Sequence, residues 1–185
     1  NVWLFAPNIL IEPGILFKQV FKEDTCLKFF IENKTDYPKN IIKNDYLHSK
    51  GLKKKTVNTN FPTTILFNNE ENVDPDIIIC CYGGMVINAI DAAYYLLIDN
   101  EITTKIYVPT MISPIDSSVI DSLASHKSKM ILIEPGYASL GWCSQLITQL
   151  IQSGEWNFYL SEIKIIGARQ EPIPSNINKE KEFYP

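Results

Sequence analysis

The sequence contains no apolar run approaching the roughly 18 residues that a membrane-spanning helix requires. It also lacks a basic segment followed by an apolar one at its start, which is the pattern of a secretory signal peptide. We therefore expect neither a membrane protein nor a secreted one. The chain starts at Asn1 instead of a methionine, and we expect that a preceding segment has been removed.

Basic residues are in the minority, with 17 lysines and arginines against 21 aspartates and glutamates. The net charge of -4 and the pI of about 5.2 argue against a general nucleic-acid binder, which usually carries a basic surface. The local exception is the lysine-rich stretch from Lys50 to Lys55. Because it lies among asparagines and lysines, we interpret it as a solvated loop in preference to a phosphate-binding patch.

Metal-binding residue types are few, with 2 histidines and 4 cysteines in the chain. Their spacing matches no zinc site, and Cys80 and Cys81 are neighbours whose side chains point to opposite faces of a predicted strand. Buried, reduced thiols of a cytoplasmic protein are the interpretation we favour. His48 lies in a polar segment, and His126 stands near the end of a predicted helix without an assignable base partner. Neither histidine therefore predicts catalysis.

The glycine-rich nucleotide motifs are absent, since neither G-x-G-x-x-G nor G-x-x-x-x-G-K-[S/T] occurs. The pair Gly83-Gly84, between an apolar strand and a helix, is compatible with a phosphate at the helix N-terminus. A tight strand-to-helix turn is the interpretation we prefer, because glycine accepts backbone angles that other residues avoid.

What the sequence does have is an ordinary globular composition, 45% hydrophobic and 21% charged over 185 residues. This length suits one domain, or one domain with a fragment of another. From residue 76 to 167, near-continuous apolar strands alternate with amphipathic helices. Such alternation predicts an α/β three-layer sandwich, with a mainly parallel sheet covered on both faces. The strands are expected at Ile77–Tyr82, Lys105–Val108, Met130–Ile133 and Ile163–Ile166, and the helices at Met85–Ile98, Asp116–Ser125 and Trp142–Gln152.

A shorter unit precedes this one. The pattern predicts a strand at Val2–Ala6, a helix that begins at Pro13 and a second strand at Leu27–Ile31. Three such elements cannot bury a core alone, so we interpret residues 1–37 as the end of another domain.

Residues 38–73 are polar and contain prolines and several asparagines. This composition predicts a linker, with Thr63–Phe67 as a candidate strand inside it. A connection of this length is uncommon within one compact domain. We therefore expect a domain boundary here, with 74–185 forming the main domain.

Glu134 is the best isolated candidate for a working carboxylate. It follows the predicted strand Met130–Ile133, at the edge where open α/β sheets usually bind ligands. A local cap or ion pair is the interpretation we favour, because no base or nucleophile can be assigned beside it. Ser113 and Asp116 bracket the start of another helix, and their short oxygen side chains favour capping over catalysis.

A series of glycines, prolines, carboxylates and short motifs, taken in order along the chain, carries a family resemblance. They are Tyr82-Gly83, Pro114-Ile115-Asp116, Glu134, Gly141, Pro172-Ile173-Pro174, Glu180 and Tyr184-Pro185, preceded by Pro7, Leu16-Phe17-Lys18 and Phe30-Ile31-Glu32-Asn33-Lys34 with Tyr37. The later series resembles the C-terminal domain of the transketolase family. It looks most like the beta chain of the thiamine-diphosphate-dependent decarboxylating component of 2-oxo acid dehydrogenase complexes.

The first segment resembles the last strand–helix–strand of the pyrimidine-binding domain of that beta chain. The sequence departs from the family pattern at two positions. Gln170 stands where the family usually has aspartate, and Asn33 stands where it often has histidine.

The resemblance implies an enzyme that decarboxylates a 2-oxo acid on thiamine diphosphate, with a divalent metal such as Mg²⁺, and passes the acyl group to a lipoyl domain. Members hold the diphosphate and the metal at a Gly-Asp-Gly motif, which this chain lacks. The glutamate that activates the cofactor lies upstream of the matched region. The resemblance therefore implies no catalytic, cofactor-binding or metal-binding residue in this chain. Interface or structural roles are expected at Glu134, Gly141, Tyr82, Gly83, Asp116, Pro172 and Pro174.

As partners, the resemblance implies a homodimer or an alpha/beta heterotetramer, together with docking of the lipoyl acyltransferase component. Two alternatives stay open. The chain could belong to a transketolase or to a deoxyxylulose-phosphate synthase-like enzyme, or it could be a stand-alone, non-catalytic binding module with the same fold. The residues do not choose among the 2-oxo acid substrates.

Overall fold

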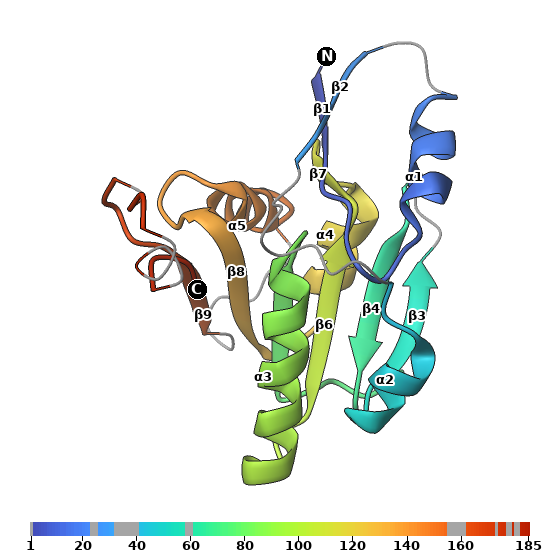
Figure 1. Cartoon of the computed structure of the whole chain (residues 1–185). Helices are drawn as coiled ribbons and strands as arrows, with labels where there is room; N and C mark the ends of the chain where they lie inside the picture. The colour runs from blue at the N-terminus through green and yellow to red at the C-terminus, as the bar shows by residue number, and fades with distance from the viewer. Residues whose placement is uncertain are drawn as a thin grey trace.

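The computed structural model describes residues 2–22, 26–31, 41–57, 61–154, 162–172, 174–176, 179 and 182–185. In this part of the chain, a six-stranded sheet has the order β3-β4-β6-β5-β8-β9 and a three-stranded sheet has the order β2-β1-β7 (Figure 1). The strands are β1 (Val2–Phe5), β2 (Leu27–Phe30), β3 (Lys53–Val57), β4 (Thr63–Phe67), β5 (Ile77–Cys81), β6 (Thr104–Pro109), β7 (Met111–Ser113), β8 (Lys129–Tyr137) and β9 (Ile163–Ala168). The helices are α1 (Pro13–Val20), α2 (Asn44–Ser49), α3 (Met85–Asn100), α4 (Ser117–Ala124) and α5 (Trp142–Gln152).

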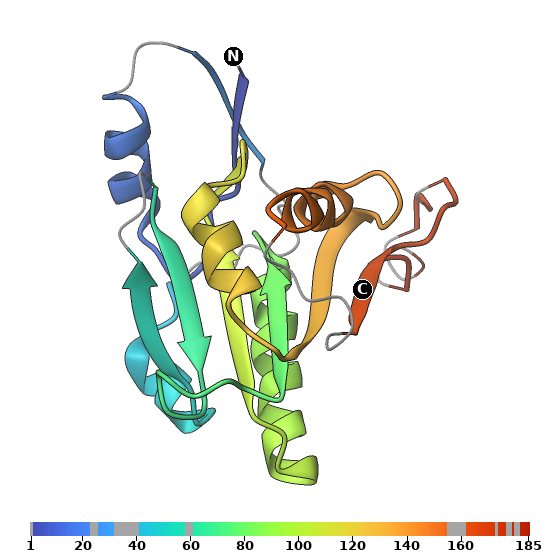
Figure 2. The same cartoon turned by 180° about the vertical axis from the view of Figure 1, so that it is seen from behind.

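The six-stranded sheet is mainly parallel and has helices on both faces (Figures 1 and 2). β5 pairs in parallel with β6 and β8, and β8 pairs in parallel with β9. β4 runs antiparallel to both β6 and β3. α3 packs on one face, whereas α4 and α5 pack on the other. The predicted α/β sandwich with a mainly parallel sheet is confirmed.

The buried strands divide their side chains between two cores, because successive residues of a strand point to opposite faces. In β5, Ile79 and Cys81 belong to the core under α3, and Ile78 and Cys80 belong to the core under α4 and α5. Both faces being covered explains why the strand is apolar throughout.

β8 departs most from its predicted bounds. The sequence predicts Met130–Ile133, whereas the strand continues to Tyr137. Its pairing with β9 shifts register between Ile133 and Tyr137 before Tyr137 pairs with Ala168. Such a shift bends a strand and re-aims its side chains. The proline and glycine in this stretch concealed the continuation, because both are depleted in strands.

The stretch predicted as a linker, 38–73, contributes two strands to the main sheet. β4 is buried along its whole length and pairs with β6, and β3 forms the sheet edge beside it. This corrects the linker interpretation for these strands, while the position of the domain boundary stays a prediction. Of the lysines that suggested a solvated loop, Lys53, Lys54 and Lys55 lie on β3 instead, and Lys50 follows α2. Lysine has a low strand propensity but is common on exposed edge strands, where it opposes pairing with other chains.

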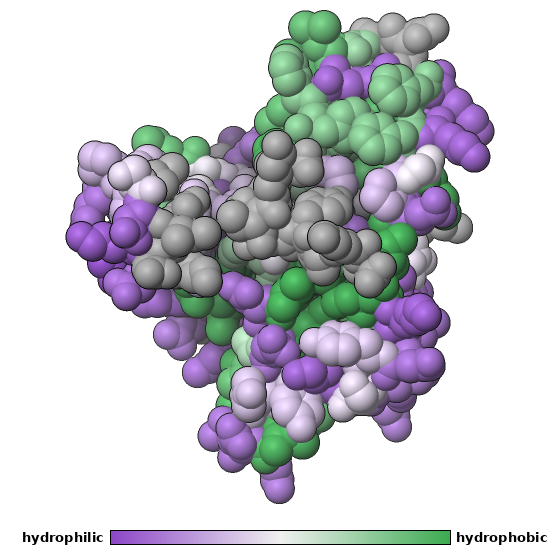
Figure 3. Space-filling model, in the orientation of Figure 1, coloured by the Kyte–Doolittle hydropathy of each residue, from purple (hydrophilic) through white to green (hydrophobic). Residues whose placement is uncertain are grey.

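The first segment is joined to the main unit through the small sheet. β1 lies between β2, with which it is parallel, and β7, with which it is antiparallel. A cluster of Phe5, Leu16, Val20 and Phe61 packs between α1 and this sheet. Trp3 and Phe30 are half-buried against this cluster. Five other apolar side chains of α1, β1 and β2 stay exposed, namely Val2, Ile15, Phe17, Leu27 and Phe29. Figure 3 shows hydrophobic residues gathered over this part of the molecule.

Candidate functional site

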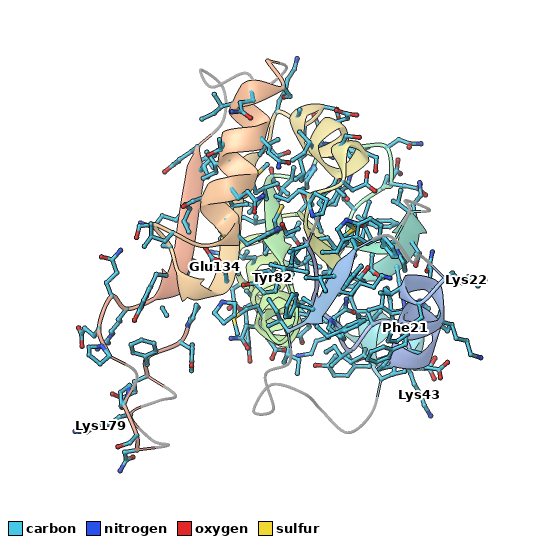
Figure 4. The ribbon with its side chains drawn as sticks, turned by 90° about the horizontal axis from the view of Figure 1, so that it is seen from above. Phe21, Lys22, Lys43, Tyr82, Glu134 and Lys179 are labelled. Atoms are coloured by element: carbon cyan, nitrogen blue, oxygen red, sulfur yellow. The ribbon has the colours of Figure 1, made fainter. Side chains whose placement is uncertain are left out.

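Tyr82 directly follows β5, and Glu134 lies in β8 just beyond Ile133, the last β8 residue that pairs with β5. Figure 4 shows the two side by side. Both are largely buried, with exposed fractions of 7% and 1%. The Tyr82 ring packs edge-on against Trp142, with the ring centroids 5.3 Å apart. Trp142 begins α5, so the site joins two strand ends to one helix N-terminus.

Glu134 holds the first turn of α5. Its Oε2 accepts a hydrogen bond from the Trp142 backbone N–H at 2.8 Å, and its Oε1 accepts one from the Cys143 N–H at 3.2 Å. The first N–H groups of a helix have no partner within the helix, and the helix dipole favours a negative charge there. The carboxylate therefore fixes α5 onto the sheet, and both of its oxygens are occupied.

Two glycines make this arrangement sterically feasible, each for its own reason. A β-carbon at Gly141 would lie 2.0 Å from Glu134 Oε2, a distance that no side chain can occupy. Gly83 has a φ of +55°, in the left-handed region that favours glycine, and follows Tyr82 directly. The turn between β5 and α3 therefore depends on Gly83, and the carboxylate position depends on Gly141.

The electrostatics of the site disfavour ionised nucleophiles. Burial raises the pKa of Tyr82 well above its ordinary range, and the charge of Glu134 raises it further. Burial and the same carboxylate raise the pKa of the Cys143 thiol. Burial also raises the pKa of Cys81 to about 12. These groups stay protonated near neutral pH, so the site offers no thiolate or tyrosinate for nucleophilic chemistry.

Asp116 lies apart from this group, at the start of α4. It is the N-cap of α4, and its Oδ1 accepts a hydrogen bond from the Ser118 N–H at 2.9 Å. Pro172 is exposed and lies after β9, beside a bond from the Tyr137 hydroxyl to the Glu171 carbonyl at 3.0 Å.

Pro174 is half-buried. Ile173, Glu180 and Asn33 lie outside the described residues. The structure therefore brings together Tyr82, Gly83, Glu134 and Gly141 around one edge of the sheet, whereas Asp116 caps α4 and Pro172 follows β9.

Sequence reasoning missed a hydrogen-bonded chain at the opposite edge. His126 Nδ1 lies 2.6 Å from Asp74 Oδ1, and His126 Nε2 lies 2.9 Å from the Tyr107 hydroxyl. The same hydroxyl lies 3.0 Å from Ser122 Oγ. Asp74 and His126 are 52 residues apart, and His126 and Tyr107 are 19 apart. No local motif signals such a pairing, because only the packing of α4 against the sheet brings these residues together.

The cofactor implied by the resemblance does not fit the described residues. No group of three or more histidine, cysteine or acidic residues among them could hold a divalent metal. The sequence also contains no Gly-Asp-Gly. We therefore assign no chemical step to this chain through thiamine diphosphate. In the described part of the chain, no helix is long and apolar enough to cross a membrane.

Comparison with known proteins gives the following similarities. Residues 69–183 match the family model described as transketolase, C-terminal domain. A split-gene transketolase, solved as an inactive beta4 tetramer, superposes with a TM-score of 0.63 at 13% identity and covers 100% of this chain and 53% of that one. This chain thus spans about half the length of that protein.

Two further transketolases are similar over smaller shares of their own length. A transketolase mutant from Pichia stipitis has 17% identity and a TM-score of 0.46, covering 77% of this chain and 19% of that one. The transketolase of Leishmania mexicana has 13% identity and a TM-score of 0.48, covering 91% and 21%.

Proposed function

Since the chain belongs to the transketolase C-terminal domain family, we propose that it is the C-terminal portion of the beta subunit of a thiamine-diphosphate-dependent 2-oxo acid dehydrogenase. In this proposal the parent enzyme decarboxylates a 2-oxo acid oxidatively and transfers the acyl group to a lipoyl domain. This chain contributes assembly and partner docking, and the catalytic and cofactor residues lie elsewhere in the parent enzyme.

The observation that carries the assembly role is the exposed apolar face of the small sheet and α1. Phe21 and Leu27 are 67% and 66% exposed, and Ile15 and Phe29 are 56% and 54% exposed. Phe30 packs against Phe17 and Phe21, so Leu27 and Phe29 point to the opposite face of the small sheet from α1. The outer side of α1 and the outer face of β2 each gain free energy when they are removed from water. We propose that the outer face of β2, with Leu27 and Phe29, packs against the remainder of the pyrimidine-binding domain or against a partner subunit.

The arrangement around Glu134 supports a structural role for the carboxyl edge. Its two oxygens accept the first N–H groups of α5, and its neighbours Tyr82 and Cys143 have raised pKa values. A general base must lie within reach of a substrate proton. Glu134 is instead only 1% exposed, and each of its oxygens accepts an N–H group of α5, which suits a domain that positions subunits.

A matched pair of variants tests the assembly role. Phe29→Glu places a charge in the proposed interface, whereas Tyr95→Glu places one at a similarly exposed aromatic on α3, outside it. We expect Phe29→Glu to dissociate the oligomer of the chain, or of the parent subunit with its alpha chain, in light scattering after gel filtration. Tyr95→Glu is expected to leave the mass unchanged. Equal behaviour of the two variants would contradict the assembly role.

The chemical part of the proposal is tested on the parent protein. An antibody against this chain should detect a natural polypeptide much larger than 21.1 kDa, whereas one of that size would favour a stand-alone binding module. The parent complex should decarboxylate 2-oxo acids, and transfer of two-carbon units between sugars would place it in the transketolase branch instead. Tight, metal-dependent binding of thiamine diphosphate to this chain alone, measured by calorimetry, would overturn the non-catalytic assignment.

A further inference from the structure

A cavity of about 460 Å³ lies between β3, β4, β6 and α4. It lies on the face of the sheet that carries α4, near the amino ends of β5 and β8 and away from Glu134. Figure 2 shows α4 on this face of the sheet. Its size lies within the range of pockets that bind small metabolites, roughly 300–1,000 Å³. None of the residues singled out from the sequence as interface candidates lines it.

The cavity combines an apolar floor with a polar wall. Val57, Ile65 and Phe67 form the floor, from adjacent positions of β3 and β4. Across the sheet, Ile65 pairs with Tyr107 and Phe67 pairs with Lys105, so the two polar groups stand directly beside the floor. A ligand with an apolar body and one polar end would match this distribution.

Lys105 is the distinctive group of the cavity. Only 5% of its surface is exposed, and its Nζ donates a hydrogen bond to the Glu71 carbonyl at 3.2 Å. Among the described ion pairs none involves Lys105. A buried ammonium without a carboxylate partner is costly, and burial lowers the pKa of Lys105 accordingly. An anion in the cavity would supply the missing partner.

The carboxylates nearest to the cavity are already paired. Glu71 Oε1 accepts a hydrogen bond from Lys55 Nζ, and Asp74 is bonded to His126 at 2.6 Å. Their negative charges nevertheless remain close to Lys105 and act on it. These two carboxylates repel a ligand with two negative charges about twice as strongly as one with a single charge. The cavity therefore favours a monoanion over a phosphate monoester.

The wall also carries a fixed hydroxyl. Burial raises the pKa of Tyr107 to about 12, so its hydroxyl keeps its proton at neutral pH. Because His126 Nδ1–H donates to Asp74, His126 Nε2 accepts the single hydroxyl proton of Tyr107, and Ser122 lies within hydrogen-bond reach of the same oxygen. Tyr107 therefore lines the wall as a neutral group, and Lys105 is the cationic donor for the charged end of a ligand.

We propose that this cavity binds a small monocarboxylate, whose charged end pairs with Lys105 and whose short apolar body lies on Val57, Ile65 and Phe67. The site is separate from the carboxyl edge and from the exposed face of α1, so it stands or falls independently of the assembly role. A ligand there would contact β3, β4 and β6 at once, and it would stabilise the folded chain by mass action.

Calorimetric titration of the full chain with three matched probes tests the proposal. Butanoate carries the required charge, butanamide has the same shape without it, and butyl phosphate carries about two charges at neutral pH. We expect saturable binding of butanoate, with butanamide and butyl phosphate each weaker by about tenfold or more, because a charge-assisted hydrogen bond is lost or opposed. Absence of butanoate binding, or tighter binding of butyl phosphate, would overturn the proposal.

Lysine variants test whether butanoate binds at Lys105. Lys105→Met removes the charge and keeps the length, and it should fold because it relieves a buried unpaired ammonium. It should bind butanoate about tenfold more weakly and no better than butanamide. Lys54→Met is the matched control, since Lys54 is the neighbouring part-buried lysine that bonds to the Leu10 carbonyl on the other face of β3. It should bind butanoate as the unmodified chain does.

A second variant keeps the test independent of Lys105. Val57→Trp places a large ring over the floor from the half-buried edge strand β3 and leaves the lysine intact. Butanoate binding should be lost, with the circular dichroism spectrum unchanged. Unmodified affinity in either Lys105→Met or Val57→Trp would show that the carboxylate binds elsewhere and would overturn the assignment.

Discussion

Gly141 lies against the carboxylate of Glu134 so closely that a β-carbon at position 141 would be 2.0 Å from Oε2. The same oxygen accepts the backbone N–H of Trp142 at 2.8 Å. Gly141 and Glu134 together therefore fix the start of α5 to β8. Neither residue would fulfil this role without the other.

Gly141→Ala should therefore destabilise the chain by about 2–4 kcal/mol, because the new methyl group forces a buried carboxylate off its hydrogen bonds. Urea unfolding followed by circular dichroism measures the change. Gly136→Ala is the matched control, since its β-carbon would lie at an ordinary 3.5 Å from the same carboxylate. Equal losses in the two variants would show that the close approach at Gly141 does not matter.

Glu134→Gln should cost about 1–3 kcal/mol, because glutamine has one acceptor oxygen for the two N–H groups of Trp142 and Cys143. It should also lower the pKa of Tyr82, since the charge of Glu134 contributes to raising it. Absorbance titration of tyrosinate measures the second effect. Glu162→Gln, at an exposed glutamate, serves as control and should change neither quantity.

Asp74→Asn should change how the free energy of unfolding depends on pH in acid. The hydrogen bond to His126 holds the pKa of Asp74 below its ordinary value. The stability that the ionised Asp74 contributes is therefore present above the unfolded pKa of about 4, and it is lost as the pH falls through the lower folded pKa. The unmodified chain should exceed Asp74→Asn in stability at about pH 5 and lose this advantage towards pH 3. Urea titrations at both pH values measure it, and a constant difference would contradict the assignment.

Tyr107→Phe should change how the free energy of unfolding depends on pH in alkaline solution. Burial raises the pKa of Tyr107 to about 12, against about 10 for an unfolded tyrosine. Between these values the unfolded chain loses a proton that the folded chain keeps, so stability falls as the pH rises. Tyr107→Phe should show a flatter decline over this window, after a loss of about 1–2 kcal/mol at neutral pH from its bonds to His126 and Ser122. Tyr95→Phe, at an exposed tyrosine, should keep the unmodified slope.

The sequence was a good guide wherever the apolar pattern was regular. The helix Trp142–Gln152 and the strand at Thr63–Phe67 have the bounds expected from their apolar pattern. It was a poor guide at the sheet edge, because β3 has one neighbour and its lysines hide the strand pattern. The sequence also did not predict the end of β8, for a related reason, since its proline and glycine resemble a turn.

By itself, the sequence determined the α/β alternation, the order of the family motifs and the absence of a diphosphate signature, because these depend on local periodicity and residue identity. Only the tertiary structure decided that Glu134 accepts hydrogen bonds from α5, and that Asp74, His126 and Tyr107 meet beside a cavity that Lys105 also lines. Such contacts join residues far apart in the chain. Their distances follow from how helices pack on the sheet, which no local pattern records.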